Sequence, residues 1–170
     1  VYADGDMYEG QWRAGGPHGQ GKFSFATGNV YEGGYVEGEM HGHGKYSASI
    51  GDVYEGEFVA GKKHGKGKET YAAGGSYEGE WAEGKQHGKG TYTYASGAVE
   101  VGCYEAGADV GQGVKWSADR TEAWELQAGK KVRGIPLDEA AQIAERGGLT
   151  GEPEVDVTGF PFLTQAVAGR

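Results

Sequence analysis

Four histidines are the residues of this 170-residue chain whose type and spacing first suggest chemistry. They stand 23 residues apart, each followed by glycine, at His18, His41, His64 and His87, and His43 follows two residues after His41. Imidazole is a common zinc ligand, so a metal site is one interpretation. On a sheet, however, positions one repeat apart would be separated by roughly 10 Å, too far to share an ion bound at about 2 Å. We therefore expect no metal site and interpret the histidines as structural.

Catalytic signatures are weak in the rest of the sequence. Segments 56–62 and 79–85 resemble part of a phosphate-binding loop, but Lys63 and Gln86 stand where the hydroxyl ligand of magnesium should be. Glutamates are plentiful, yet they occupy equivalent repeat positions, whereas a general acid and a general base need different environments. Cys103 belongs to no Cys-His signature. We expect neither enzymatic activity nor a cofactor.

Composition narrows the class of protein further. Glycine accounts for 35 residues, proline for only 4 and aromatic residues for 12%, which indicates a folded chain and excludes collagen. The net charge of -9 argues against a nucleic-acid partner. We find no secretory leader and no apolar run of about 20 residues, and a single cysteine is compatible with a reducing compartment. A cytoplasmic location is therefore expected.

A 23-residue repeat positions all of these side chains, and such a fixed period dictates a repeat architecture. The triplet Tyr-Glu-Gly begins at Tyr8, Tyr31, Tyr54 and Tyr77, and a fifth copy decays to Glu100-Val101-Gly102. An aromatic column follows four residues later, at Trp12, Tyr35, Phe58, Trp81 and Tyr104.

Each repeat reads as two strands. Tyr8, Gly10 and Trp12 are spaced by two, which places them on one face of a strand, and glycine-rich turns follow. A glycine between two aromatic residues on the same face leaves room for a ring to lie across bare backbone. The opposite face presents a column of glutamates, at Glu9, Glu32, Glu55 and Glu78. The sequence thus predicts a mainly β fold, an elongated, twisted, single-layer antiparallel sheet of consecutive β-hairpins.

The pattern Tyr-Glu-Gly-x-aromatic-x-x-Gly-x-x-His-Gly-x-Gly resembles the MORN (membrane occupation and recognition nexus) repeat over about residues 1–118. With a degenerate sixth unit near 122–134, in which Leu126 could fill the aromatic position, the array covers residues 1–134. Residues 1–5 match the end of a preceding unit, so we expect the chain to be cut from a longer array. The resemblance implies a non-catalytic module and adds a proposed phosphoinositide association.

The C-terminal residues leave the repeat. Pro136 and two acidic residues precede a run that ends at Gly147-Gly148, which predicts a short helix within 135–148 that caps the last hairpin. Residues 149–170 are expected to be a tail or linker, in which Phe160-Pro161-Phe162-Leu163 is apolar enough to dock in a groove.

The leading functional hypothesis is a protein-binding scaffold or adaptor, in cytoskeletal or membrane-associated assemblies, whose aromatic groove holds a partner helix or peptide. Tyr and Trp dominate binding hot spots. The residues predicted to line the groove are Tyr8, Trp12, Tyr31, Tyr35, Tyr54, Phe58, Tyr77 and Trp81.

Two alternatives stay open. The first is an anionic-phospholipid (phosphoinositide) module at the lysine cluster of Lys62, Lys63, Lys66 and Lys68. The second is a regulatory domain of a larger enzyme such as a lipid kinase or methyltransferase. The ends of the sheet also suggest a homo-oligomer, such as a homodimer.

Overall fold

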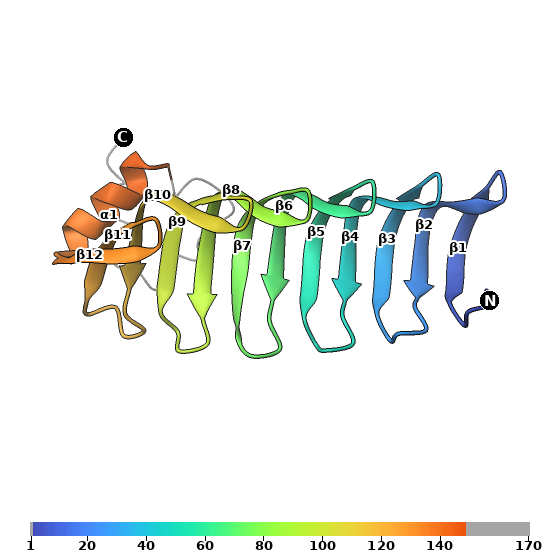
Figure 1. The fold of residues 1–170 in the computed structure, drawn as a ribbon, viewed down its shortest axis with the longest axis horizontal. Coiled ribbons are helices and arrows are strands. Elements are labelled where there is room, and N and C mark those ends of the chain that lie inside the picture. The colour runs from blue at the N-terminus through green and yellow to red at the C-terminus, as the bar shows by residue number, and fades with distance from the viewer. Residues whose placement is uncertain (1, 149–170) are drawn as a thin grey trace, which may run out of the picture. The chain divides into compact units, whose positions relative to one another are not determined.

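A computed structural model describes residues 2–148 of the chain (Figure 1). It contains one antiparallel sheet of 12 strands in which each strand is a neighbour of the next in sequence. The strands are β1 (Met7–Arg13), β2 (Gly16–Ser24), β3 (Val30–Val36), β4 (Glu39–Ser47), β5 (Val53–Val59), β6 (Lys62–Thr70), β7 (Gly75–Ala82), β8 (Lys85–Tyr94), β9 (Val99–Glu105), β10 (Ala108–Trp116), β11 (Ala123–Gln127) and β12 (Lys130–Ile135). One helix, α1 (Leu137–Arg146), follows. The predicted sheet of consecutive hairpins with a short C-terminal helix is confirmed.

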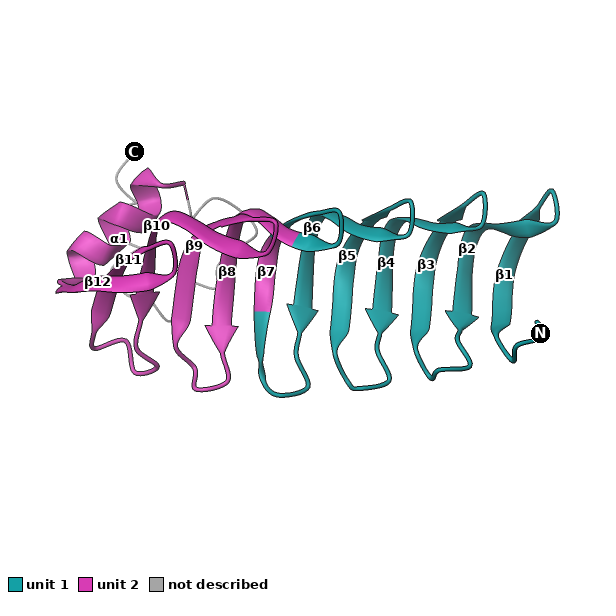
Figure 2. Cartoon of the chain, in the orientation of Figure 1, with its two compact units in different colours: residues 1–76, 80–85 teal, residues 77–79, 86–170 magenta. Residues whose placement is uncertain are grey.

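The chain divides into two compact units (Figure 2). Unit 1 holds residues 1–76 and 80–85. Unit 2 holds residues 77–79 and those from 86 onward, of which the structure describes residues up to 148. The predicted tail, 149–170, lies outside the described residues.

Tight turns close the hairpins, as the glycine column predicts. In the third hairpin, Ala60 and Gly61 have φ angles of 48° and 76°, the left-handed pair of a type I′ turn. The turns between hairpins also use a glycine with positive φ, such as Gly51 at 98°. In the fifth repeat Arg120 takes this place with a φ of 60° and donates a hydrogen bond to the carbonyl of Gly97 (2.9 Å).

The face that carries Tyr54 and Phe58, here called the front face, is built on glycine pairs. The ring of Tyr54 lies across Gly56 and Gly67, where an added Cβ would lie only 2.6 Å and 2.2 Å from the Tyr54 hydroxyl. Any larger residue would displace the ring. This arrangement of a ring over a pair of strand glycines, here called a cradle, recurs under the other tyrosines of the column, Tyr8, Tyr31 and Tyr77. This confirms the prediction that the strand glycines make room for rings.

Interlocked rings form the core of unit 1. Tyr35 meets the rings of Tyr8 and Tyr31 edge-on, with both centroid distances 5.2 Å. Phe58 lies in the same way against Tyr31 (4.9 Å) and Tyr54 (5.1 Å). Edge-to-face pairs of this kind add about 0.5–1.5 kcal/mol beyond the buried area. Each aromatic residue thus joins its own repeat to the preceding one.

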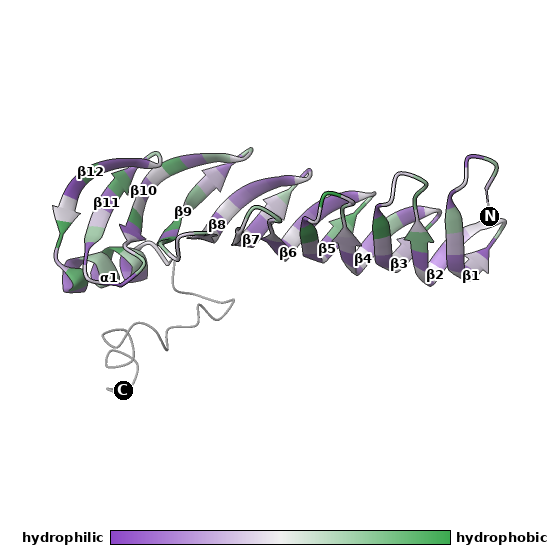
Figure 3. Cartoon of the chain, turned by 90° about the horizontal axis from the view of Figure 1, so that it is seen from below, coloured by the Kyte–Doolittle hydropathy of each residue, from purple (hydrophilic) through white to green (hydrophobic). Residues whose placement is uncertain are grey.

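The opposite face of unit 1, here called the back face, carries a row of alternating charge. Lys45 is the cross-strand neighbour of Glu32 on one side and of Glu55 on the other, and Lys68 is the next neighbour of Glu55. The complete row, all exposed, is Glu9, Lys22, Glu32, Lys45, Glu55 and Lys68. Figure 3 colours these strands by hydropathy, with hydrophilic residues in purple and hydrophobic residues in green. The predicted glutamate column is present, but lysines neutralise it.

In the fifth hairpin, in unit 2, the middle of the back face is apolar and buried. Val101 and Val114, which are cross-strand neighbours 3% and 0% exposed, share a buried cluster with α1. The helix contributes Ala140, Ile143 and Ala144 to this cluster. It contacts β10 and β11, which belong to the fifth and sixth hairpins, so it covers a strand of the last hairpin, which the sequence predicted it to cap, and also a strand of the fifth.

Candidate functional site

The residues predicted to line a groove form the floor of the front face. Seven of the eight expose 7% or less, namely Tyr8, Tyr31, Tyr35, Tyr54, Phe58, Tyr77 and Trp81. Trp12 is 53% exposed, with Tyr2 stacked at 6.5 Å. Because the buried rings contact one another, a partner on this face would meet other side chains first. Whether a partner binds there stays a prediction.

Above this floor in unit 1 lies an outer aromatic band, defined as Phe23, Phe25, Tyr46 and Tyr71, all half-buried. Phe23 is the cross-strand neighbour of Tyr8, which places it on the front face. Its ring lies 4.6 Å from that of Phe25, which in turn lies 6.4 Å from Tyr46. The sequence signals this band through Phe23 and Tyr46 in one repeat column, but the more regular inner column overshadows it.

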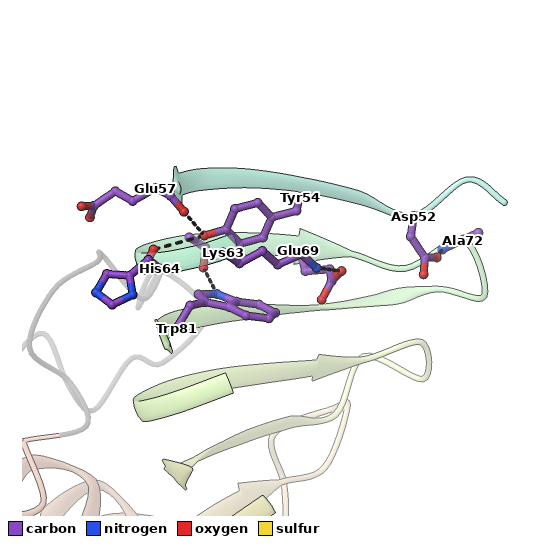
Figure 4. Close-up of polar contacts among 9 residues, drawn as sticks. Asp52, Tyr54, Glu57, Lys63, His64, Glu69, Ala72 and Trp81 are labelled. Atoms are coloured by element: carbon purple, nitrogen blue, oxygen red, sulfur yellow. Dashed lines mark hydrogen bonds and ion pairs between the residues drawn. The ribbon is translucent and has the colours of Figure 1, made fainter. Parts of the chain in front are cut away.

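Lys63 is held inside the front face (Figure 4). Its Nζ forms an ion pair with Glu69 and lies 4.9 Å and 4.8 Å from the ring centroids of Tyr54 and Trp81. Trp81 donates from Nε1 to the carbonyl of Gly67 at 3.1 Å. Burial raises the pKa of the Tyr54 hydroxyl, which donates a hydrogen bond within its own strand. The ammonium of Lys63, whose side chain is 23% exposed, thus has Glu69 and two rings as its neighbours.

The four lysines predicted to bind lipid do not all lie on the same face of the sheet. Three of its members alternate with front-face residues and lie on the back face: Lys62, Lys66 and Lys68. Lys62 forms an exposed ion pair with Glu83, and that bond lowers the pKa of the Glu83 carboxyl. Lys68 lies opposite Glu55. A membrane facing these lysines would also face the acidic members of the row.

The histidine column shows no metal-binding arrangement in the described part of the chain. Within residues 2–148, no group of three His, Cys, Asp or Glu side chains could hold an ion. His64 is the cross-strand neighbour of Glu57, and its carbonyl accepts a long hydrogen bond, 3.4 Å, from the Tyr54 hydroxyl.

Sequence reasoning missed a polar cluster on the front face of the fifth hairpin. Glu100, which takes the place of the repeat tyrosine, is 4% exposed. Its Oε2 accepts hydrogen bonds from the Tyr94 hydroxyl (2.6 Å) and from Lys115 Nζ (3.2 Å). Asp109 approaches the same carboxyl, and its pKa is raised by burial and by Glu100. Lys115 also lies 3.4 Å from the centroid of the Tyr94 ring.

Comparison with known proteins identifies the family. Residues 8–30, 31–53, 54–76 and 77–99 each match the MORN repeat, and together they cover more than half of the sequence. The chain belongs to the MORN repeat family. No match to a curated protein was found.

Among solved structures, the chain is similar to the TCP domain of SAS-4 (dCPAP) from Drosophila melanogaster, determined in complex with a proline-rich motif of Ana2 (dSTIL). The alignment covers 80% of this chain and 94% of that chain, at 9% identity and a TM-score of 0.24. A score this low supports no inference about this protein. Separately, within residues 2–148 no helix has the length and apolar character needed to span a membrane.

Proposed function

We propose that this MORN array is a non-catalytic scaffold or adaptor that holds a segment of a partner protein on its front face. The observation that carries the proposal is the outer aromatic band, whose half-buried rings stand on a closely packed aromatic floor. Partly exposed aromatic residues on a rigid base lose little conformational entropy on binding, and they are enriched at interfaces. Cytoskeletal or membrane-associated assemblies in the cytoplasm are the setting that we propose.

The repeat spacing favours an extended segment that crosses the strands. Equivalent positions of successive hairpins are about 9.6 Å apart, because two strand spacings separate them. A polyproline II segment advances about 9.3 Å in three residues, so every third side chain would meet the same repeat position. Seven residues of an α-helix advance about 10.5 Å, a poorer match that drifts with each repeat. Among the partners expected from the sequence, an extended peptide therefore fits better than a helix.

A selected peptide ligand tests this proposal. A random peptide library is panned against the whole chain, and the Kd of a recovered peptide is measured by calorimetry for Phe25→Ser with Tyr71→Ser. We expect the Kd to rise at least tenfold, which corresponds to about 1.4 kcal/mol. The matched control is Val36→Ser with Val59→Ser, which removes back-face side chains that are 45% and 42% exposed. Equal binding by both double variants, with the fold intact by circular dichroism, would refute the proposal.

The lipid alternative has weaker support, because the lysines lie on two faces and beside glutamates. Flotation with phosphoinositide vesicles tests it: wild-type binding that Lys66→Glu with Lys68→Glu abolishes would favour a lipid module over the peptide scaffold. The regulatory-domain and homo-oligomer alternatives stay predictions.

A further inference from the structure

The fifth hairpin places an acidic residue where the preceding repeats place a tyrosine. Glu100 follows Tyr77 by 23 residues, and its neighbour Gly102 belongs to the glycine column. Above Gly56 an added Cβ would lie 2.6 Å from the tyrosine hydroxyl, whereas above Gly102 the nearest atom is Asp109 Oδ1 at 4.0 Å. The space above Gly102 thus holds no ring, and the atom nearest to it belongs to the Asp109 carboxyl.

The two carboxyls are unequally supplied with partners. Tyr94 and Lys115 both donate hydrogen bonds to Glu100. Burial and the neighbouring Glu100 carboxyl raise the pKa of Asp109. A hydrogen bond between two carboxyl groups requires a proton, because two carboxylates can only accept. The raised pKa makes Asp109 bind such a proton more readily than an ordinary aspartate does.

The surroundings of Asp109 contain few other charges. Among the described residues, β8 contributes the phenols of Tyr92 and Tyr94, and β7 and β9 contribute those of Tyr77 and Tyr104. The Tyr104 hydroxyl also hydrogen-bonds the Asp109 carboxyl. The cations near the hairpin are engaged: Lys115 with Glu100, and Lys131 of β12 over the ring of Trp124 at 3.4 Å. A carboxylate at Asp109 would thus lie beside Glu100 without a cation of its own.

The same two strands hold α1 on their other face. Val101 is adjacent to Glu100 in sequence, Val114 is adjacent to Lys115, and both valines belong to the cluster beneath the helix. Any movement that separates β9 from β10 on the front face therefore disturbs the base on which α1 docks.

We propose that the Glu100–Asp109 carboxyl pair is a pH-sensitive contact. While the pair shares a proton it stabilises the packing of β9, β10 and α1, and loss of that proton destabilises this packing. Loss of the proton leaves two neighbouring carboxylates, one buried and one half-buried, where like charges repel. This inference does not depend on the front face binding a peptide.

The sign of the pH dependence follows from the direction in which Asp109 is shifted. Its pKa is higher in the folded protein than the ordinary value of 3.8, so the folded state binds more protons than the unfolded state between the two values. The stabilisation is complete below the ordinary pKa and is lost as the pH rises through the raised one. The packing of β9, β10 and α1 should thus be most stable in acid.

Hydrogen exchange of the whole chain at pH 3.5 and pH 8, corrected for intrinsic rates, tests the proposal. We expect protection of the β9, β10 and α1 amides to fall between the two pH values relative to the β3 and β4 amides, which serve as the internal reference. Asp109→Asn, which keeps the shape and cannot ionise, should remove this dependence. Glu100→Gln provides a second isosteric variant with the same expectation.

The matched control is Glu69→Gln, which alters the Lys63 ion pair two repeats earlier and should leave the pH dependence of β9 and β10 unchanged. Wild-type protection that is equal at the two pH values, or a dependence that persists in Asp109→Asn and Glu100→Gln, would overturn the proposal.

Discussion

The third hairpin, in unit 1, and the fifth hairpin, in unit 2, use the same repeat positions with opposite polarity. In the third, Tyr54 is buried on the front face, while Glu55 and Lys68 are exposed on the back face. In the fifth, the first of these positions holds Glu100, and the other two hold the buried pair Val101 and Val114. The positions of Lys63 and Glu69 hold Asp109 and Lys115 in the fifth hairpin, so the two charges are exchanged, and Lys115 pairs with Glu100 instead.

This comparison teaches how a repeat sheet can change the face that it buries. Successive residues of a strand point to opposite faces, so replacing Tyr-Glu by Glu-Val exchanges the apolar and polar sides at that point. The charged row of unit 1 favours an exposed back face, because covering it would desolvate every member. The valine pair removes that cost and gives α1 an apolar base.

The largest expected effect on stability comes from placing charged residues of the unit 1 row at the equivalent positions of the fifth hairpin. Val101→Glu with Val114→Lys should destabilise unit 2 by about 3–5 kcal/mol, because it places two charges beneath α1. Urea unfolding and the exchange of α1 amides measure it. The reverse change in unit 1, Glu55→Val with Lys68→Val, should alter stability by no more than about 1 kcal/mol because these residues are exposed. Similar losses in both double variants would contradict the comparison.

A smaller effect is expected at matched glycines. In Gly56→Ala the new Cβ would lie 2.5 Å from the Cα of Gly67, so backbone must move, and we expect a loss of at least about 2 kcal/mol. Gly102→Ala meets nothing closer than 4.0 Å, and its stability should stay within about 1 kcal/mol of wild type. Thermal unfolding distinguishes the two. A Gly102→Ala variant as unstable as Gly56→Ala would show that the fifth cradle is also filled.

The smallest expected effect concerns two tyrosines of one column. The Tyr35 hydroxyl is buried without a hydrogen-bond partner among the described residues, and Met40 is its cross-strand neighbour. The equivalent hydroxyl of Tyr104 has Asp109. Tyr35→Phe should therefore stabilise the protein by about 1 kcal/mol, whereas Tyr104→Phe should destabilise it by about the same amount. Denaturant midpoints measure both, and a loss of stability in Tyr35→Phe would mean that its hydroxyl finds a partner.

The sequence was sufficient to predict the repeat, the hairpins, the turn glycines and the cradles, because each of these features depends on spacing along the chain. It was also sufficient for α1, whose boundaries are locally encoded. Alternation along β6 already separates Lys63 from the other lysines of the cluster, but their closeness in sequence obscured this.

The remaining features depend on how side chains meet across strands. No spacing reveals that the rings of the inner column are buried and that the outer aromatic band is the accessible surface. Glu100 lies opposite Lys115 and Asp109 lies opposite Tyr104 across β9–β10, and spacing along the chain does not signal that the two carboxyls approach each other.

Valine methyl groups provide the most direct test of the exchange between exposed and buried back faces. Methyl-labelled protein is titrated with a soluble paramagnetic probe, and the relaxation enhancement of each valine is measured. We predict strong enhancement at Val36 and Val59, which are 45% and 42% exposed, and protection at Val101 and Val114 beneath α1. Enhancement of Val101 and Val114 equal to that of Val36 and Val59 would contradict the account.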